Sequence, residues 1–439
     1  MCTFEASMKL LIYTHKVTQR FSYVMRQVFG RILQVEFETT TKVEDFIKHT
    51  GPKITYAKQP LQNEFFIRAN DLLFERGIND FHIEMGKWEE LPCFFEAGER
   101  SNIPFDIFSA SFFLLSRYEE YLPHVKDELG RFKPNDSLAF QNGFLQLPLV
   151  DLWAFKLLKV LTIRFPDLRY KQREYQFTPI VNVVQSHRYA YRSALRTFGG
   201  FASDLLTLRF ARFRDRFMVV TNKMKDPFDQ FFDLIRLHQE YGVKGHFFFQ
   251  FADYSTQDKN IAVHKNKFRY LIKSVADYEP VSLSASHAAA RELKTLKLEK
   301  KRLSDLINRP IEFVRTRNNR VHIPETYRQL IEAEFTADYS MGYSQELGFR
   351  ASTCTPFYFY DLLLEIQQPL RVYPFALCDE ALLKIRKKTK LKEQIEVMAQ
   401  ATQLVNGHMI QVFSNELLGR KLRVNWMELY QEMLRTYSR

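Results

Sequence analysis

Short apolar segments that alternate with helical patterns constrain the fold of residues 171–439 more than any other feature of the chain. This alternation is typical of βα units, which assemble into a parallel sheet or a barrel. We therefore predict an α/β fold with a distorted seven-stranded (β/α) barrel, whose functional side chains gather at the carboxyl ends of the strands. The predicted strands are residues 178–184, 246–251, 280–284, 311–315, 338–343, 371–377 and 409–413.

Helical patterns fill the intervals between these segments. The clearest one follows Asp226, which is predicted to cap a helix that has Pro227 in its first position and Gly242 just past its end. Further helices are predicted at 292–308, 324–334 and 393–405, and Asn406-Gly407 closes the last of them.

Residues 1–170 show a mixed pattern and are predicted to form an α+β domain of their own, followed by the barrel at 171–439. Strand-like stretches at 9–13 and 57–68 flank a helical stretch at 21–33.

A dense apolar run in this first part predicts a buried helix that ends near Tyr121. Polar residues at its end form either a polar site or an ordinary helix-end charge cluster, and the second interpretation needs fewer assumptions. They are Arg117, Glu119, Glu120 and His124.

Composition indicates a globular protein, with 46% hydrophobic residues and only 15 Gly and 16 Pro among 439 residues. The 41 Phe and 21 Tyr residues indicate cores dominated by aromatic packing. A formal charge of +12 favours anionic partners. The basic residues lie in separate helical stretches, as on solvated helix faces, and we expect no nucleic-acid partner.

Neither a disulfide framework nor a structural zinc site is indicated, because the cysteines are far apart and form no CxxC pair. Reduced thiols predict a cytoplasmic protein. No run approaches the ~18 apolar residues of a membrane span, and the start lacks a secretory core, whether the chain begins at Met1 or Met8. The cysteines are Cys2, Cys93, Cys354 and Cys378.

Long blocks in fixed order resemble the polysaccharide deacetylase family, which has a nodulation-protein-B-type barrel, in its two-domain Bacteroidetes form. The resemblance covers about residues 8–418. It implies a hydrolase that uses a divalent metal such as zinc, with an Asp as base and a His as acid, to remove N-acetyl groups from sugars. The blocks are RYEEYLPHVKDELGRF, LRTFGGF, KDPFD, FFFQFADYSTQDKN, EKKRL, PETYRQLI, DYSMGYSQELGFRASTCTPFYFYD and YPFAL.

The metal and acid/base positions implied by this resemblance are altered. The family's first motif, a strand end with two aspartates, has Asn182 and Val184 in their places. The motif that supplies a metal-binding histidine has Ser284, and the Arg-Gln-His motif ends in Arg317. The last motif, Phe-His-Asn-Glu, has Ser414 in place of the acid histidine. Neither an amide nor an alkyl group can act as a base or bind a cation as carboxylates do.

Because these losses fall at separate strand ends while the scaffold blocks persist, we predict a catalytically inactive relative that uses no cofactor and binds a glycan or a partner protein. Residues that match the family elsewhere are candidates for a glycan pocket. They are Asp253, Arg315, Tyr358 and Asp379.

Two alternatives remain open from the sequence. The first is an active metal-dependent deacetylase with a relocated ligand set of His187, His287 and His322, which lie a few residues past three strand ends. The second is a basic scaffold that docks peripherally on an anionic surface through a helix with Phe210 and Phe217 among several arginines.

Overall fold

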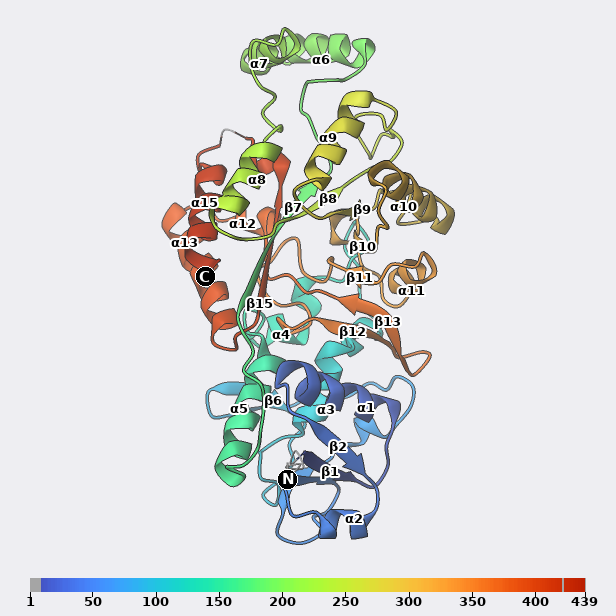
Figure 1. Cartoon of the computed structure of the whole chain (residues 1–439), viewed down its shortest axis with the longest axis vertical. Coiled ribbons are helices and arrows are strands. Elements are labelled where there is room, and N and C mark those ends of the chain that lie inside the picture. Colours follow the sequence, from blue (N-terminus) through green and yellow to red (C-terminus); the bar gives the residue numbers. More distant parts are fainter. Residues whose placement is uncertain (1–8, 421, 439) are drawn as a thin grey trace, which may run out of the picture.

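The computed structural model describes residues 9–420 and 422–438 (Figure 1). The predicted choice between Met1 and Met8 as the start, and the environment of Cys2, lie outside these residues. The N-terminal part contains a sheet with strand order β2-β1-β3-β4, and every pairing in it is parallel. Its strands are β1 (Leu10–Thr14), β2 (Phe37–Thr40), β3 (Lys53–Ala57) and β4 (Phe65–Arg68).

The helices of this part cover the small sheet and bury most of their apolar side chains. The predicted buried helix is α3, which is buried along its whole length and begins where Asp106 accepts hydrogen bonds from the backbone N–H groups of Phe108 and Ser109. It ends at Leu115 rather than near Tyr121, because Arg117 takes a left-handed backbone conformation before a short 3₁₀ turn. An antiparallel hairpin, β5 (Met85–Trp88) and β6 (Leu91–Phe94), lies beside it. The helices are α1 (Gln19–Met25), continued by a π-helical stretch (Arg26–Ile32), α2 (Val43–Lys48), α3 (Ile107–Leu115), α4 (Leu138–Gln141) and α5 (Leu149–Arg164).

The second part is built on a nine-stranded sheet of order β12-β13-β11-β10-β9-β8-β7-β15-β14. All neighbours are parallel except β12 and β13, and no pairing joins the two edges among the described residues. The strands are β7 (Gln176–Val183), β8 (His246–Phe249), β9 (Val281–Ser284), β10 (Phe313–Arg315), β11 (Ala337–Asp338), β12 (Phe357–Asp361), β13 (Ile366–Val372), β14 (Leu377–Cys378) and β15 (His408–Ser414).

The predicted α/β class of this part agrees with the structure, and each predicted strand overlaps an observed one. The predicted count of seven is not confirmed. The aromatic stretch that forms β12 lacks a preceding helix and pairs antiparallel at the edge, and the predicted strand 371–377 is divided between β13 and β14.

Most helices of this part pack around the sheet, whereas α6 and α7 lie beyond one end of it (Figure 1). Among the described residues, no helix has both the length and the apolar character needed to cross a bilayer. The helices are α6 (Ala194–Leu206), α7 (Phe210–Val220), α8 (Phe231–Glu240), α9 (Asn266–Ala276), α10 (Leu293–Ile307), α11 (Glu325–Glu332), α12 (Asp379–Leu382), α13 (Lys388–Gln403), α14 (Asn415–Leu418) and α15 (Trp426–Tyr437).

The prediction that Asp226 caps a helix is wrong. Helix α8 begins only at Phe231, because the Asp226 carboxylate accepts hydrogen bonds from the backbone N–H groups of residues 188–190 and of Phe228. Asp226 therefore holds the loop after β7. The predicted stop at Gly242 agrees with its φ of 67°, a conformation that glycine adopts without a steric cost.

Successive side chains of each strand point to opposite faces of the large sheet, so its inner and outer faces carry different residues. Ile180 of β7 and Ile410 of β15 point inward and belong to a small apolar cluster of their own. Their neighbours along the strands, such as Val181, point outward into the main core. Because successive side chains alternate, Asn182 and Ser414, which lie an even number of positions further along the same strands, emerge on the inner face at the carboxyl ends.

A buried ion cluster joins the end of α3 to the segment after β11. Glu120 accepts hydrogen bonds from Arg117 Nε (2.8 Å) and from Arg350 Nε and Nη2 (2.9 and 2.6 Å), and all three side chains are buried. Burial alone would raise the pKa of Glu120, but the guanidinium groups of Arg350 and Arg117 hold that pKa at about 2. The predicted helix-end charge cluster is therefore a structural link between the two parts of the chain.

Replacing Glu120 by Gln is expected to lower the free energy of unfolding by about 3–5 kcal/mol, because it leaves two buried guanidinium groups without a counter-charge. Urea denaturation followed by circular dichroism measures this loss. The control is Glu38→Gln, which breaks the exposed ion pair with Lys9 and should cost far less stability, because exposed pairs are screened by solvent. Equal losses in the two variants would contradict the proposed role of the cluster.

Candidate functional site

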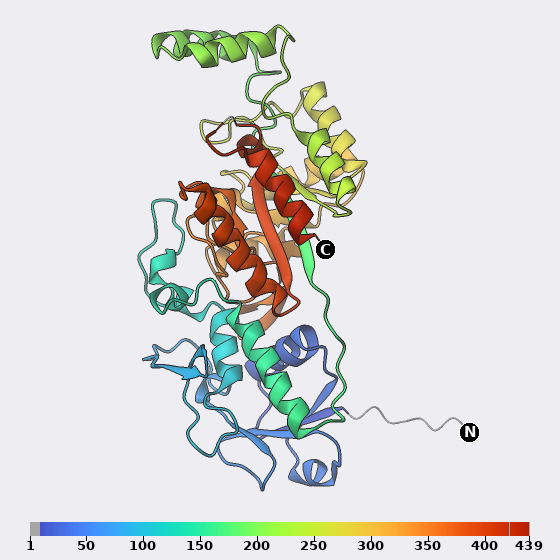
Figure 2. The same cartoon turned by 90° about the vertical axis from the view of Figure 1, so that its left-hand side faces the viewer.

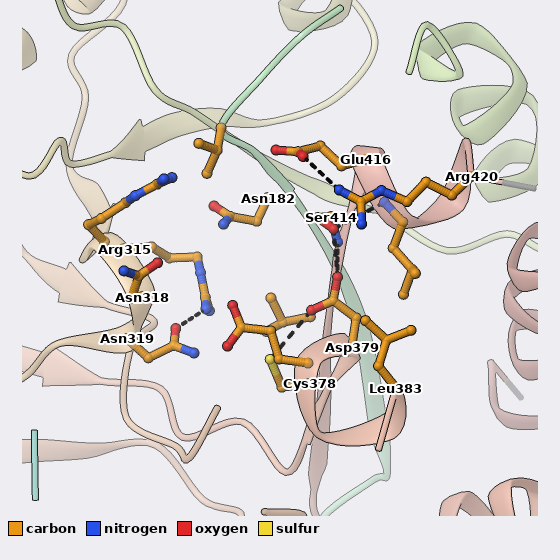
Figure 3. A pocket seen from close by; sticks show the side chains of 15 residues that line it. Asn182, Arg315, Asn318, Asn319, Cys378, Asp379, Leu383, Ser414, Glu416 and Arg420 are labelled. Atoms are coloured by element: carbon orange, nitrogen blue, oxygen red, sulfur yellow. Dashed lines mark hydrogen bonds and ion pairs between the residues drawn. The ribbon is translucent and has the colours of Figure 1, made fainter. Parts of the chain in front are cut away.

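A polar pocket of about 260 Å³ lies at the carboxyl ends of the inner face of the large sheet (Figure 3). Asn182 of β7 and Ser414 of β15 are direct neighbours in the strand register. Arg315 ends β10, and Asp379 follows β14. The fifteen lining residues are Asn182, Val184, Arg315, Arg317, Asn318, Asn319, Cys378, Asp379, Glu380, Leu383, Val412, Ser414, Glu416, Leu417 and Arg420.

Four of the five altered motif positions line this pocket, together with two of the four candidate glycan residues. Ser284 does not line it, although it pairs with Arg315 in the strand register. The residues brought together are Asn182, Val184, Arg317, Ser414, Arg315 and Asp379.

Asp253 and Tyr358 lie elsewhere. Asp253 is exposed and forms an ion pair with Arg302 of α10 at 2.8 Å. Tyr358 lies on the edge strand β12, where the guanidinium of Arg31 stacks on its ring at 4.7 Å. The structure does not bring these two candidates to the pocket, since the direction of the loop after β8 and the edge pairing of β12 set their positions.

Arg315 is buried and fixed in place. Its Nη1 donates to the backbone carbonyl of Tyr339 and its Nη2 to Oδ1 of Asn319. The rings of Phe248 and Phe375 also lie near its guanidinium, at 5.9 and 5.1 Å. Burial lowers the pKa of Arg315, while nearby acidic groups oppose that shift. With these bonds made, only Nε remains without a hydrogen-bond partner among the described residues.

Ser414 has a structural role at the position where the family resemblance implies a catalytic acid. Its Oγ donates to Asp379 Oδ2 at 2.6 Å and accepts a hydrogen bond from the backbone N–H of Leu417, so that it caps α14. The backbone N–H of Ser414 also donates to Asp379. Ser414 and Asp379 thus satisfy each other and tie α14 to α12.

Arg317 and Asn182 also have hydrogen-bonding capacity to spare. No hydrogen bond or ion pair involves the Arg317 guanidinium in residues 9–420 and 422–438, and the side chain is half-buried. Asn182 Oδ1 is a buried acceptor that has no hydrogen-bond partner there. Unpaired buried polar atoms cost free energy, which a polar ligand would recover.

Acidic side chains balance the three arginines of the pocket. Glu416 lies 3.5 Å from Arg420 and Glu380 is adjacent to Asp379. Burial raises the pKa of Glu416 despite the opposing charge of Arg420, and burial followed by the charge of Asp379 raises the pKa of Glu380. The pocket therefore contains charges of both signs that can pair with hydroxyl groups as donors or acceptors.

The sequence analysis missed several lining residues. Glu416 is the last residue of the Phe-His-Asn-Glu motif and lies on α14, Arg420 lies just after that helix, and Asn318 and Asn319 follow Arg317. Both asparagines have positive φ values, 54° and 52°, in a tight turn after β10. Their proximity to the motifs was the available signal, but the turn that directs them into the pocket was not predicted.

The three histidines of the relocated zinc set have separate surroundings. His187 is buried, bonded to Ser186 Oγ, and burial lowers its pKa. The backbone N–H of His287 donates to Asp258. His322 contacts Lys126 and Glu325 near the surface. Within the described ranges, no group of three or more His, Cys, Asp or Glu residues has an arrangement that could hold a metal ion.

The pocket residues themselves do not fit the divalent metal that the family resemblance implies. Val184 offers no donor atom, Asn182 a single neutral oxygen, and Arg317 a fixed cation that would repel a metal ion. Ser414 Oγ is already bonded to Asp379 and to the α14 backbone. We therefore derive no metal-dependent step from this site.

A second polar cluster lies behind the end of β9. Glu299 of α10 accepts hydrogen bonds from Ser286, through both the backbone N–H (3.1 Å) and the hydroxyl group. Asp258 lies nearby and accepts from Gln250 and His287. Burial raises the pKa of Glu299 to about 7, although the Ser286 hydrogen bonds oppose the shift.

Comparisons with known proteins leave the function open. A family model described as a family of unknown function, DUF7033, matches residues 10–166, which is less than half of the chain. A comparison with curated proteins gives no match.

Three solved structures are similar in part. A protein assigned as a polysaccharide deacetylase from Mycobacterium smegmatis is 12% identical, with a TM-score of 0.38 over 61% of this chain and 87% of that one. PuuE allantoinase is 11% identical, with a TM-score of 0.35 over 60% of this chain and 83% of that one. A protein assigned as a polysaccharide deacetylase from Pseudomonas aeruginosa PAO1 is 12% identical, with a TM-score of 0.37 over 60% of this chain and 84% of that one. At these scores the likeness supports no conclusion about activity or ligand.

Ser414→Ala is expected to lower the free energy of unfolding by about 1–2 kcal/mol, because it removes the α14 cap and the bond to Asp379. Ser414→Thr keeps the hydroxyl group and should retain most of the stability. Urea denaturation of both variants tests this. If the Ala variant is as stable as the wild type, Ser414 is not a cap that the fold needs.

Glu299→Gln is expected to remove a pH-dependent loss of stability. Because the folded-state pKa of about 7 exceeds the unfolded value near 4.5, the stabilising protonated form is fully present below pH 4.5 and is lost as pH rises to 7. Wild type should therefore lose on the order of 2–3 kcal/mol relative to the variant over this range. Denaturation at several pH values measures the difference, and the control Glu240→Gln, which changes an exposed residue and keeps Glu299, should retain the pH dependence of the wild type.

Proposed function

We propose that this chain is a catalytically inactive protein on a polysaccharide-deacetylase-like scaffold, and that its strand-end pocket binds a hydroxyl-rich carbohydrate. The observation that carries the proposal is the pocket itself. Four altered motif positions line it together with Arg315 and Asp379. A polar cavity therefore lies where the family resemblance implies a reaction centre.

The chemistry of the lining argues against hydrolysis. A general base must take a proton from the attacking water, which the Asn182 amide cannot do at neutral pH. Asp379 is held by Ser414, and Ser414 caps a helix. Arg317 stands where the resemblance implies a neutral histidine, and its charge is fixed.

The same lining suits hydroxyl groups. Arg317 offers guanidinium donors, Asn182 offers an unpaired acceptor, and Glu380 and Glu416 add carboxylates. Among the fifteen described lining residues none is aromatic, so hydrogen bonds rather than ring stacking would hold the ligand. A volume of about 260 Å³ favours one sugar unit over a long segment, since small-ligand pockets begin at ~300 Å³.

Purified protein should release no acetate from N-acetylated chito-oligosaccharides, with or without added zinc, cobalt or nickel. Asn182→Asp should also be inactive, because the change restores one carboxylate and no other metal ligand. Acetate is measured by an enzyme-coupled assay, and metal content by elemental analysis. Metal-dependent acetate release by the wild type would reject the inactive assignment and support the active alternative.

Binding of the same oligosaccharides to the protein is measured by saturation-transfer NMR and calorimetry. Arg317→Gln should weaken binding by about 10–100-fold, the effect of losing a hydrogen bond to a charged group. Arg236→Gln, on the exposed face of α8, is the matched control and should bind as the wild type does. The absence of binding by the wild type, or equal affinity of the two variants, would contradict a carbohydrate site at this pocket.

A further inference from the structure

Helices α6 and α7 form a hairpin that stands apart from the body of the molecule. They lie side by side at one end, beyond the carboxyl ends of β7 and β15 (Figures 1 and 2). The chain enters the hairpin after β7 and returns to the body before α8. Within the described residues, the principal packing partner of α6 is α7.

The two helices contact each other mainly through polar and aromatic groups. Arg216 of α7 forms a buried ion pair with Asp204 of α6 at 2.8 Å, and Phe201 meets Phe213 with ring centroids 5.0 Å apart. Gly200 lets the Arg216 guanidinium approach, since a Cβ at this position would overlap its Nη1 atom. These contacts define the side of α6 that faces α7.

Most other apolar residues of α6 lie on another side of the helix and are exposed. Leu195, Phe198 and Leu206 are 87%, 74% and 84% exposed, and Ala202 and Leu205 continue their stripe at helical spacing. The only described residue of α6 that is buried is Asp204. An ordinary surface helix buries its apolar stripe and exposes its charges, so α6 has the opposite arrangement.

The turn and α7 extend the exposed apolar surface and surround it with positive charge. Leu208, Phe210 and Phe217 are exposed, as are Arg212 and Arg214. Residues 192–223 contain seven Arg or Lys and only two Asp, with no Glu. Asp204 pairs with Arg216 and Asp215 with Arg214 (3.4 Å), so the segment keeps an excess of five basic residues.

We infer that the α6–α7 hairpin docks on the surface of a bilayer that contains anionic phospholipids. Exposed Leu and Phe side chains with a surrounding set of arginines are the chemistry of helices that lie in the membrane interface. The apolar stripe enters the boundary between headgroups and acyl chains, and the arginines pair with lipid phosphates. The charge of the hairpin thus complements an anionic surface, and its position places the strand-end pocket on the side of the protein that carries the membrane contact.

The test is co-sedimentation of the full chain with vesicles of phosphatidylcholine containing about one-third phosphatidylglycerol. Wild type should bind these vesicles, bind pure phosphatidylcholine at least about tenfold more weakly, and dissociate as salt rises from about 0.05 to about 0.5 M. The combined variant Leu195→Ser, Phe198→Ser and Leu206→Ser should lose at least about tenfold in partition coefficient.

A matched control replaces three apolar residues on the body that are 70–76% exposed: Ile163→Ser, Tyr270→Ser and Leu404→Ser. It should bind as the wild type does, with unchanged circular dichroism in both variants. Failure of the wild type to bind anionic vesicles, or equal binding of the two variants, overturns the proposal. If light scattering instead shows a dimer that only the hairpin variant abolishes, and no vesicle binding occurs, the stripe is an interface between two copies of the chain.

Discussion

The alternation of side chains along a parallel sheet is the constraint on which the rest of this structure depends. Ile180 and Ile410 point inward and fill the curled sheet. Asn182 and Ser414 lie an even number of positions further along the same strands, so they point the same way, and the register makes them neighbours. Strand geometry therefore decides which positions face this edge, and the side chains at these positions make the pocket polar.

The residues at these positions have bonds that stabilise the fold. Ser414 caps α14 and holds Asp379, and Arg315 is fixed by Asn319 and the Tyr339 carbonyl. Ser414 and Asp379, which are bonded to each other and to the backbone, are poorly suited to move protons. The Arg317 guanidinium differs because it lines the pocket without such bonds among the described residues. Binding and structure, rather than proton transfer, are what this arrangement favours.

Charge is used in two different ways in the molecule. In the interior, Glu120 is enclosed by Arg117 and Arg350, and this closed cluster joins the N-terminal part to the large sheet. At the far end, α6 and α7 expose arginines beside apolar side chains. Loss of one side chain from the Glu120 cluster would leave a buried charge without a partner and lower the stability of the fold. The exposed arginines of α6 and α7 are available to an external partner.

Local patterns in the chain were enough to predict the alternation of strands and helices, the approximate strand ends, and the residue types that stand there, because hydrophobic periodicity and side-chain chemistry are local properties. Folding in three dimensions was needed to set the pairing of β12 and β14, the use of the Asp226 carboxylate for the 188–190 loop, and the exposure of Asp253. It also turned the apolar stripe of α6 away from the protein. These features depend on contacts between segments distant in the chain, which no local pattern specifies.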